Sequence, residues 1–207
     1  MPFATSYAMF YYNKDLLKEA GLDPENPPRT YNEVKEAARI IVDKTDSYGF
    51  TTSLNGWFFE QLMANANALY LNNDNGWSSK PTESLVNQEE GLRIFRWFDE
   101  MYKEGTFKNF GGNFEDTLGP FLAGQVAMML YSSAALVEII NNAPFEVGVT
   151  TLPVPDGKTP YGETVGGSTN YITNVVSQEK QKYAWEFIKY LTSPETQAKW
   201  LSPSEYN

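Results

Sequence analysis

The chain has 207 residues, of which 42% are hydrophobic and 20% are charged, and its formal net charge is −10. This acidity argues against nucleic acid or an anionic membrane as a partner, because both require a basic face. The chain contains no cysteine and no histidine, which excludes thiol nucleophiles, serine–histidine catalysis and nearly all zinc and copper sites. No apolar run approaches the roughly 18 residues of a membrane-spanning helix, so we expect no membrane insertion, and we expect no cofactor.

The first stretch predicts a strand that leads directly into a helix. Thr5 and Ser6 precede an apolar and aromatic block over 7–12 that is rich in strand-forming residues. Asn13 is a good helix N-cap, and Gly21 ends the short helix that follows. Natural N-termini are usually loosely held and polar. We therefore interpret this stretch as a strand that crosses between two lobes, the first of which is mostly missing from the chain.

Strands and helices alternate along the rest of the chain, which predicts the α/β class. Apolar spacing and capping residues predict helices over 31–44, 55–68, 88–104, 114–123, 134–141 and 178–192, and from 194 onward. Strands are expected within 46–52, 126–131, 145–153 and 166–173. The residues expected to face the core are Leu92, Phe95, Phe98 and Met101 or Tyr102 in one helix, and Ala184, Phe187, Ile188 and Leu191 in another.

The segment 72–76 is predicted to be a loop. Its sequence, Asn-Asn-Asp-Asn-Gly, partly matches a calcium-binding loop, but Leu71 occupies the position of the first carboxylate ligand. Because the required acidic ligands are missing, we expect no metal at this loop.

Six sequence blocks occur in one order along nearly the whole chain, at residues 2–16, 21–24, 28–33, 121–128, 152–153 and 184–197. Together they resemble the family 1 extracellular solute-binding proteins of ABC importers, which are two-lobed receptors for sugars and for glycerol-3-phosphate. The block Pro-Arg-Thr-Tyr-Asn-Glu at 28–33, for example, is similar to the Pro-x-Thr-Trp-x-Glu of that family. The resemblance implies a periplasmic-binding-protein type II-like lobe, in which helices flank a mixed sheet.

The same resemblance implies a domain organisation and a function. The family has further residues before Pro2, which form most of the first lobe. Residues 1–164 would then be the second lobe, and 165–207 an incomplete returning segment of the first. The family captures a carbohydrate in the cleft between the lobes by hinge closure and delivers it to the membrane subunits of an ABC permease. The resemblance further implies a monomer in the periplasm or outside the cell, tethered as a lipoprotein in its full-length form.

Nine residues are candidates for contact with the ligand. Trp57 follows Gly56 at the start of a predicted helix, where a ring can stand free of the core and stack on a sugar. The family carries cleft tryptophans in this loop, and its glycerol-3-phosphate branch has two, the earlier of which falls here on Leu54. Packing at the start of the helix is the alternative role of Trp57. The other eight candidates, matched by their position in the family pattern, are Thr5, Ser6, Ser132, Ser133, Gly166, Gly167, Ser168 and Tyr206.

The alternative roles of these residues are structural. The hydroxyls of Thr5 and Ser6 could make a hydrogen bond at a strand end, and Ser132 and Ser133 could cap a helix. Small residues at 166–168 let backbone N–H groups approach a ligand. Tyr206 follows Ser204–Glu205, where the family has Thr-Gly.

An uncharged carbohydrate is the expected ligand, because a phosphate would require a bidentate cation and no arginine falls in a matched cleft block. A glycerol-3-phosphate or polyol-phosphate receptor is the runner-up. A glycosidase needs only two carboxylates, and Glu60 and Glu163 are the acids near proposed cleft positions. A domain used only for protein contacts is a third alternative. We expect no enzymatic activity, and we expect this chain alone to bind a sugar weakly or not at all.

Overall fold

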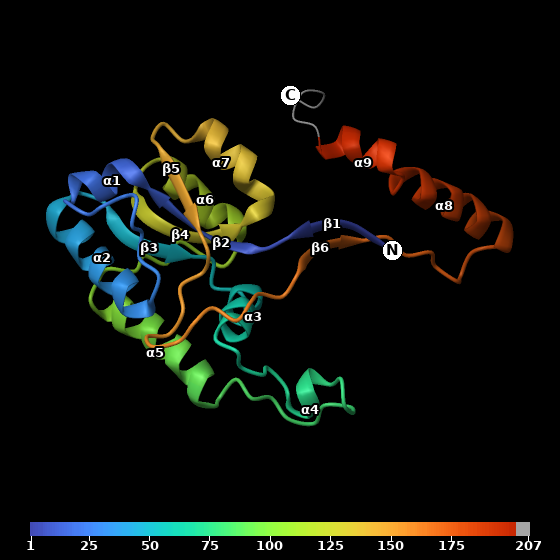
Figure 1. The fold of residues 1–207 in the computed structure, drawn as a ribbon, viewed down its shortest axis with the longest axis horizontal. Helices are drawn as coiled ribbons and strands as arrows, with labels where there is room; N and C mark the ends of the chain where they lie inside the picture. Colours follow the sequence, from blue (N-terminus) through green and yellow to red (C-terminus); the bar gives the residue numbers. More distant parts are fainter. Residues whose placement is uncertain (202–207) are drawn as a thin grey trace. The chain divides into compact units, whose positions relative to one another are not determined.

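The computed structural model describes residues 1–201, which divide into two compact units. The larger unit comprises Tyr7–Thr164, and the smaller one comprises Met1–Ser6 together with the residues from Val165 onward. Both contain helices and strands (Figure 1), so the predicted α/β class is confirmed. Residues 1–6, which we expected in the larger domain, belong to the smaller unit because they pair with a strand that begins at Gly166.

A four-stranded mixed sheet lies at the centre of the larger unit, as predicted. Its strands are β2 (Ala8–Asn13), β3 (Tyr48–Thr52), β4 (Val126–Ser132) and β5 (Val147–Thr150). The order across the sheet is β3, β4, β2 and β5, with β3 parallel to β4 and β2 antiparallel to both of its neighbours. Aromatic and β-branched residues, which favour strands, make up half or more of β2, β3 and β5.

Helices cover both faces of this sheet (Figure 1). Side chains alternate along β4, so that Met128 and Leu130 join one apolar cluster while Met129 and Tyr131 join the other. The first cluster includes residues of α1 (Lys14–Glu19), α2 (Tyr31–Lys44), α3 (Gly56–Asn65) and α5 (Glu89–Lys103). The second includes residues of α6 (Phe114–Leu122) and α7 (Leu136–Asn142), which follows the 3-10 turn η1 (Ser133–Ala135).

The predicted N-caps of the first two helices are confirmed. The Asn13 side chain accepts hydrogen bonds from the N–H groups of Asp15 and Leu16, both at 3.0 Å. Thr30 and Glu33 form the expected capping box of α2. Because these caps satisfy N–H groups that have no partner inside the helix, they fix where each helix begins.

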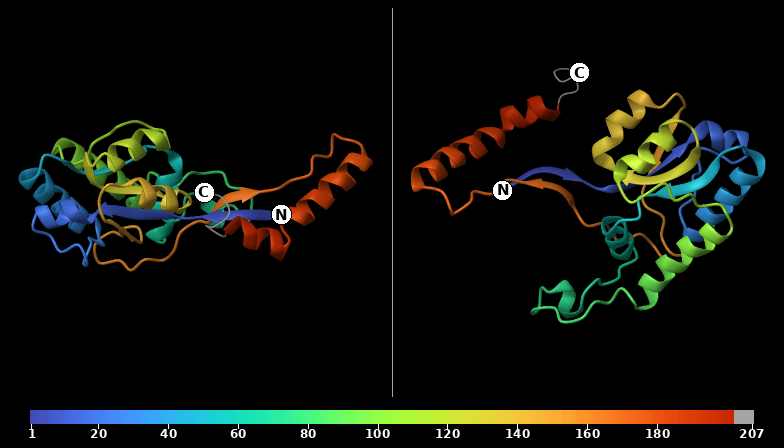
Figure 2. Two further views of the ribbon diagram at one scale, coloured as in Figure 1. Left: turned by 90° about the horizontal axis from the view of Figure 1, so that it is seen from above. Right: turned by 180° about the vertical axis from the view of Figure 1, so that it is seen from behind.

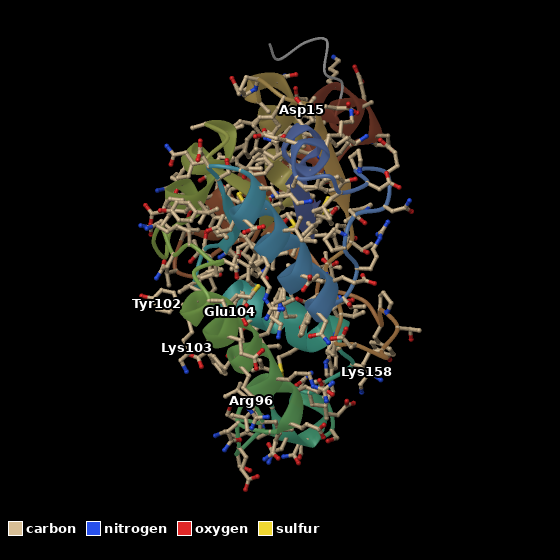
Figure 3. The ribbon with its side chains drawn as sticks, turned by 90° about the vertical axis from the view of Figure 1, so that its left-hand side faces the viewer. Asp15, Arg96, Tyr102, Lys103, Glu104 and Lys158 are labelled. Carbon is tan, nitrogen blue, oxygen red and sulfur yellow. The ribbon has the colours of Figure 1, made fainter. Side chains whose placement is uncertain are left out.

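The buried face of α5 differs in part from our prediction. Met101 is buried and Phe98 packs against the core as predicted, but Ile94 and Trp97 are also buried, whereas Phe95 is 56% exposed and Tyr102 is 64% exposed. Leu92, also expected in the core, is exposed as well. Figure 3 shows Tyr102 together with Arg96 and Lys103 on the outer side of this helix. Two apolar stripes of helical spacing overlap in this sequence, and the stripe that meets the aromatic rings of α2 and β3 is the one that is buried.

Residues 66–88 form an arm that extends away from the sheet and carries the single turn α4 (Asn72–Asn75) at its end (Figure 2). Helix α3 ends at Asn65, before the predicted Ala68, because the backbone of Asn67 adopts a positive φ of 57°. The predicted loop at 72–76 contains this turn, in which Asn73 and Asp74 have left-handed backbone angles.

The smaller unit contains a two-stranded antiparallel sheet of β1 (Pro2–Ser6) and β6 (Gly166–Thr169), followed by α8 (Gln178–Leu191) and α9 (Pro194–Leu201). Ile188 of α8 is buried as predicted, but Phe187 is 61% exposed. No helix among residues 1–201 has the length and apolar content needed to cross a membrane.

Candidate functional site

Three strands of the larger unit end at one edge of its sheet. β3 and β4 are parallel, and β5 runs in the same direction because both β4 and β5 are antiparallel to β2. Thr52, Ser132 and Thr150 are the last residues of these strands, and Ala8, which pairs with Ser132, is the first residue of β2. Open α/β sheets bind ligands outside the carboxyl ends of their strands. This edge is therefore the candidate site of the larger unit.

Ser132 and Ser133 bring two hydroxyl groups to the edge. The Oγ of Ser132 accepts a hydrogen bond from the Ala134 N–H at 3.2 Å, so Ser132 is the N-cap of η1. The Oγ of Ser133 accepts from the Tyr7 N–H at 3.0 Å. A hydroxyl can donate as well as accept, and no hydrogen bond found within residues 1–201 uses the hydrogen of either serine. Both hydroxyls therefore retain a donor for a ligand oxygen.

Trp57 belongs to an aromatic cluster that reaches the same edge. It lies in the first turn of α3, which Asn55 caps by accepting from the Phe58 N–H at 3.3 Å. The indole contacts the rings of Phe58 and Phe114, with centroids 4.9 and 5.8 Å away. Phe114 in turn meets Tyr131 edge-on at 5.3 Å. Trp57 is half-buried, so its ring packs partly against the core instead of standing free of it as the sequence suggested.

The charges around Tyr131 are negative, whereas at the end of β5 the guanidinium of Arg29 donates to the hydroxyl of Thr150. Burial, together with the carboxylates of Glu115 and Glu138, raises the pKa of Tyr131 to about 12. The segments on the Tyr131 side of the edge, residues 52–57, 114–118 and 131–136, contain no lysine or arginine. A neutral polyhydroxyl compound fits this environment better than a phosphate does.

Glu163 lies beside the same edge. Its carboxyl faces the backbone N–H groups of Ala8, which begins β2, and of Leu152, which follows β5. Burial raises the pKa of Glu163 to about 7, although these two N–H groups act in the opposite direction. Its Oε2 atom is buried and has no hydrogen-bond partner among the described residues. The edge therefore holds a carboxyl group that is partly protonated near neutral pH.

The remaining candidates belong to the smaller unit. Antiparallel pairing of β1 with β6 sets Thr5 opposite Gly167 and Ser6 opposite Gly166, and Ser168 lies opposite Ala4. Gly167 has a φ of 124°, and a Cβ added there would lie 2.0 Å from the Ala4 carbonyl oxygen, so glycine is required for this close approach. The strand pairing thus brings five of the predicted residues together. Tyr206 lies outside the described residues.

Sequence reasoning missed two aromatic members of the edge and undervalued one acid. Tyr131 was seen only as part of a buried strand, although the alternation along β4 places it on the face of α6 and α7. No sequence signal near Phe114 distinguishes it from an ordinary core residue. Glu163 was considered only as a catalytic acid, because its contact with the N–H groups of Ala8 and Leu152 arises from tertiary structure. Within residues 1–201, no three acidic side chains are grouped as metal ligands.

A mixed α/β sheet with helices on both faces and polar residues at its strand ends is the fold of a periplasmic-binding-protein lobe, and solved structures of that type superimpose on this chain. The family model described as bacterial extracellular solute-binding protein matches residues 1–198. The chain belongs to this family.

Relatives and solved structures agree with this assignment. The sn-glycerol-3-phosphate-binding periplasmic protein UgpB of Brucella abortus is 30% identical over 99% of this chain and 47% of its own length. The maltose-bound structure of T. maritima MalE3 is 25% identical, with a TM-score of 0.78 over 95% of this chain and 51% of that protein. UgpB from Mycobacterium tuberculosis, solved with glycerophosphocholine, is 23% identical, with a TM-score of 0.76 over 96% and 48% of the two chains.

These matches describe binding proteins and not enzymes. The chain spans about half the length of the curated relatives it matches, 47% in the case of the Brucella protein.

Proposed function

We propose that this chain forms part of the solute-binding component of an ABC importer, which captures a carbohydrate and delivers it to membrane permease subunits. The observation that carries the proposal is the edge of the larger unit, where three strands end beside an aromatic cluster and two serine hydroxyls with free donors. Aromatic rings bind the C–H faces of a sugar, and hydroxyl groups pair with its oxygens.

The proposal includes a division into two lobes. The larger unit, Tyr7–Thr164, would be the second lobe of the receptor, and the segment from Val165 would return to the first lobe. Thr5, Ser6 and Gly166–Ser168 would then supply small and hydroxyl residues at the two points where the chain crosses between lobes. We further propose that the receptor is a monomer, located in the periplasm or outside the cell and tethered there as a lipoprotein.

A polyol phosphate is the second candidate ligand, because the Brucella relative is named for binding sn-glycerol-3-phosphate. Arg29, which donates to Thr150 at the end of β5, is a cation in contact with this edge. The acidic groups near Tyr131 and the absence of lysine and arginine from residues 52–57, 114–118 and 131–136 favour the neutral sugar instead. A raised pKa, such as that of Glu163, is also found in the general acids of glycosidases. Any ligand titration should therefore also measure whether reducing sugar is released.

Calorimetric titration of the two-lobed receptor separates these possibilities. We expect saturable binding of a neutral saccharide or polyol, little dependence of the affinity on salt, and no release of reducing ends. A preference for glycerol-3-phosphate that weakens as salt rises would show that a cation elsewhere in the receptor determines the ligand. Steady release of reducing ends would contradict the assignment as a binding protein.

A further inference from the structure

A hollow of about 660 Å³ lies in the larger unit between the arm and the segment 161–164. We call it the arm hollow. Its volume falls within the range of small-molecule sites, about 300–1,000 Å³. The side chains that bear on its chemistry are Trp77, Tyr161, Asn67, Asp74, Asn75 and Glu163.

Trp77 is presented to solvent by a well-ordered turn. Its side chain is 88% exposed, although it is one of the largest apolar groups in the chain. Asn75 Oδ1 accepts from the N–H groups of Tyr70 and Leu71, both at 2.8 Å, and the Trp77 N–H donates to the Asp74 carbonyl at 3.1 Å. Gly76 precedes the tryptophan with a φ of 87°, which favours glycine. The turn therefore fixes the backbone that carries an exposed ring, and this ring contributes nothing to the core.

Tyr161 supplies a second exposed ring from a different part of the chain. Its side chain is 73% exposed, while its N–H donates to the carbonyl of Asn65 at 3.1 Å. The same segment is held at Thr164, whose carbonyl accepts from Gln61 Nε2 at 3.0 Å. Both aromatic groups of the arm hollow are thus attached to backbone that is anchored by hydrogen bonds.

The polar groups of the arm hollow suit hydroxyl groups. The Oδ1 of Asn75 is already engaged, so its NH₂ group is left to donate. Asp74 and Glu163 are acceptors, and Glu163 has a buried oxygen without a partner among the described residues. The two acids disfavour an anion. A quaternary ammonium ion would bind the faces of the two rings, but it has no oxygen that could accept a hydrogen bond from the Asn75 amide.

From these observations we propose that the arm hollow is an accessory binding site for a neutral oligosaccharide, which stacks on Trp77 and Tyr161. The rings of this site are distinct from the aromatic cluster at the sheet edge, although Glu163 borders both places. Trp57 and Ala64 lie near opposite ends of α3, and the helical rise of about 1.5 Å per residue separates them by roughly 10 Å along its axis. An open surface site of this kind should bind weakly, with a Kd of about 1 mM.

NMR of the tryptophan indole N–H signals of the 207-residue chain tests the proposal. The probes are maltotetraose, cellotetraose, xylotetraose and mannotetraose, with choline as a comparison. We expect at least one tetrasaccharide to shift the Trp77 signal in a saturable way, and Tyr161→Ala to weaken that binding by tenfold or more. Trp77→Ala assigns the signal by removing it. Trp185→Ala, which removes another exposed tryptophan, is the matched control and should change nothing.

Trp57→Ala should leave the Trp77 response intact, which separates this proposal from that for the sheet edge. If no tetrasaccharide shifts the Trp77 signal, or if Tyr161→Ala leaves the affinity unchanged, the accessory site is refuted. A response to choline without any response to the sugars would also refute it. A shift confined to the Trp57 signal would refute the accessory site while supporting binding at the sheet edge.

Discussion

Trp97 and Trp77 belong to the same unit but have opposite environments. Trp97 is buried, stacks on Tyr31 with the ring centroids 4.2 Å apart, and donates its Nε1–H to the Tyr31 carbonyl at 3.0 Å. Trp77 is almost fully exposed. The sequence could not distinguish these roles, because the apolar pattern around Trp97 fits two helix faces and Trp77 lies in a polar segment without periodicity. The partner that decides the burial of Trp97 is distant in sequence.

We expect Trp97→Phe to lower the free energy of unfolding by about 1–3 kcal/mol, because the buried contact with Tyr31 loses the hydrogen bond from the indole N–H. Trp77→Phe is the matched control and should change it by less than about 0.5 kcal/mol. Urea denaturation measures both values. Equal effects of the two substitutions would contradict the assignment of Trp97 to the core.

Glu163 makes stability depend on pH. Its pKa is about 7 in the folded chain, against an ordinary value of 4.5. Between these values the folded chain retains a proton that the unfolded chain has released. The stability that this group contributes is therefore fully present below pH 4.5 and is lost as the pH rises through about 7.

Glu163→Gln should remove this loss, since glutamine stays neutral. We expect the melting temperature of the variant minus that of the wild type to increase as the pH is raised from about 5 to about 8. Glu60→Gln, at an exposed position of α3, should show no such trend. A difference between Glu163→Gln and the wild type that stays constant with pH would contradict the burial of this carboxyl.

Among the secondary-structure elements, the starts of helices were easier to predict than their C-terminal ends or their buried faces. The start of α2 was predicted correctly because Thr30 and Glu33 signal a capping box within four residues of sequence. The end of α3 was missed because the left-handed backbone at Asn67 depends on the turn that follows. The exposure of Phe187 on α8 was missed because helical spacing identifies a stripe but not whether a partner covers it.

Glycine substitutions in two helices should have opposite effects. Gly56 begins α3, and a Cβ added there meets no heavy atom within 4 Å, so Gly56→Ala should raise the free energy of unfolding by about 0.5–1 kcal/mol. Gly91 lies in α5, where an added Cβ would be 2.0 Å from the Val86 carbonyl oxygen. We expect Gly91→Ala to lower it by about 1–3 kcal/mol. Chemical denaturation of both variants tests this, and changes of the same sign would contradict the packing of α5 against residue 86.

The two units of the molecule differ in how many residues of their elements are buried. Six of the seven residues of β4 are buried, whereas Ile188 is the one buried residue of α8. A helix of this length gains little stability without tertiary packing. The buried strands and the helix caps could be predicted from the sequence because they are local signals, and the mixed sheet was implied by the family resemblance. It could not show that Trp57, Phe114 and Tyr131 form one cluster, since their contacts join three separate segments.

Hydrogen exchange should reveal this difference in the intact chain. We expect the amides of α8 to exchange at least about tenfold faster than those of β4, because α8 opens without unfolding the larger unit. Mass spectrometry of peptides from both elements measures the rates. Equal protection of α8 and β4 would contradict the division into two units of unequal stability.

Binding of a solute at the sheet edge beside Trp57 can be tested directly. Trp57→Leu keeps an apolar side chain against Phe58 and Phe114 but removes the ring face, and Trp77→Leu at the arm hollow is the matched control. The decisive measurement is the affinity of the two-lobed receptor for its neutral saccharide, with melting curves to verify that each variant is folded. We predict that Trp57→Leu weakens binding by about tenfold or more. An unchanged affinity in a folded Trp57→Leu receptor would contradict binding of the solute beside Trp57.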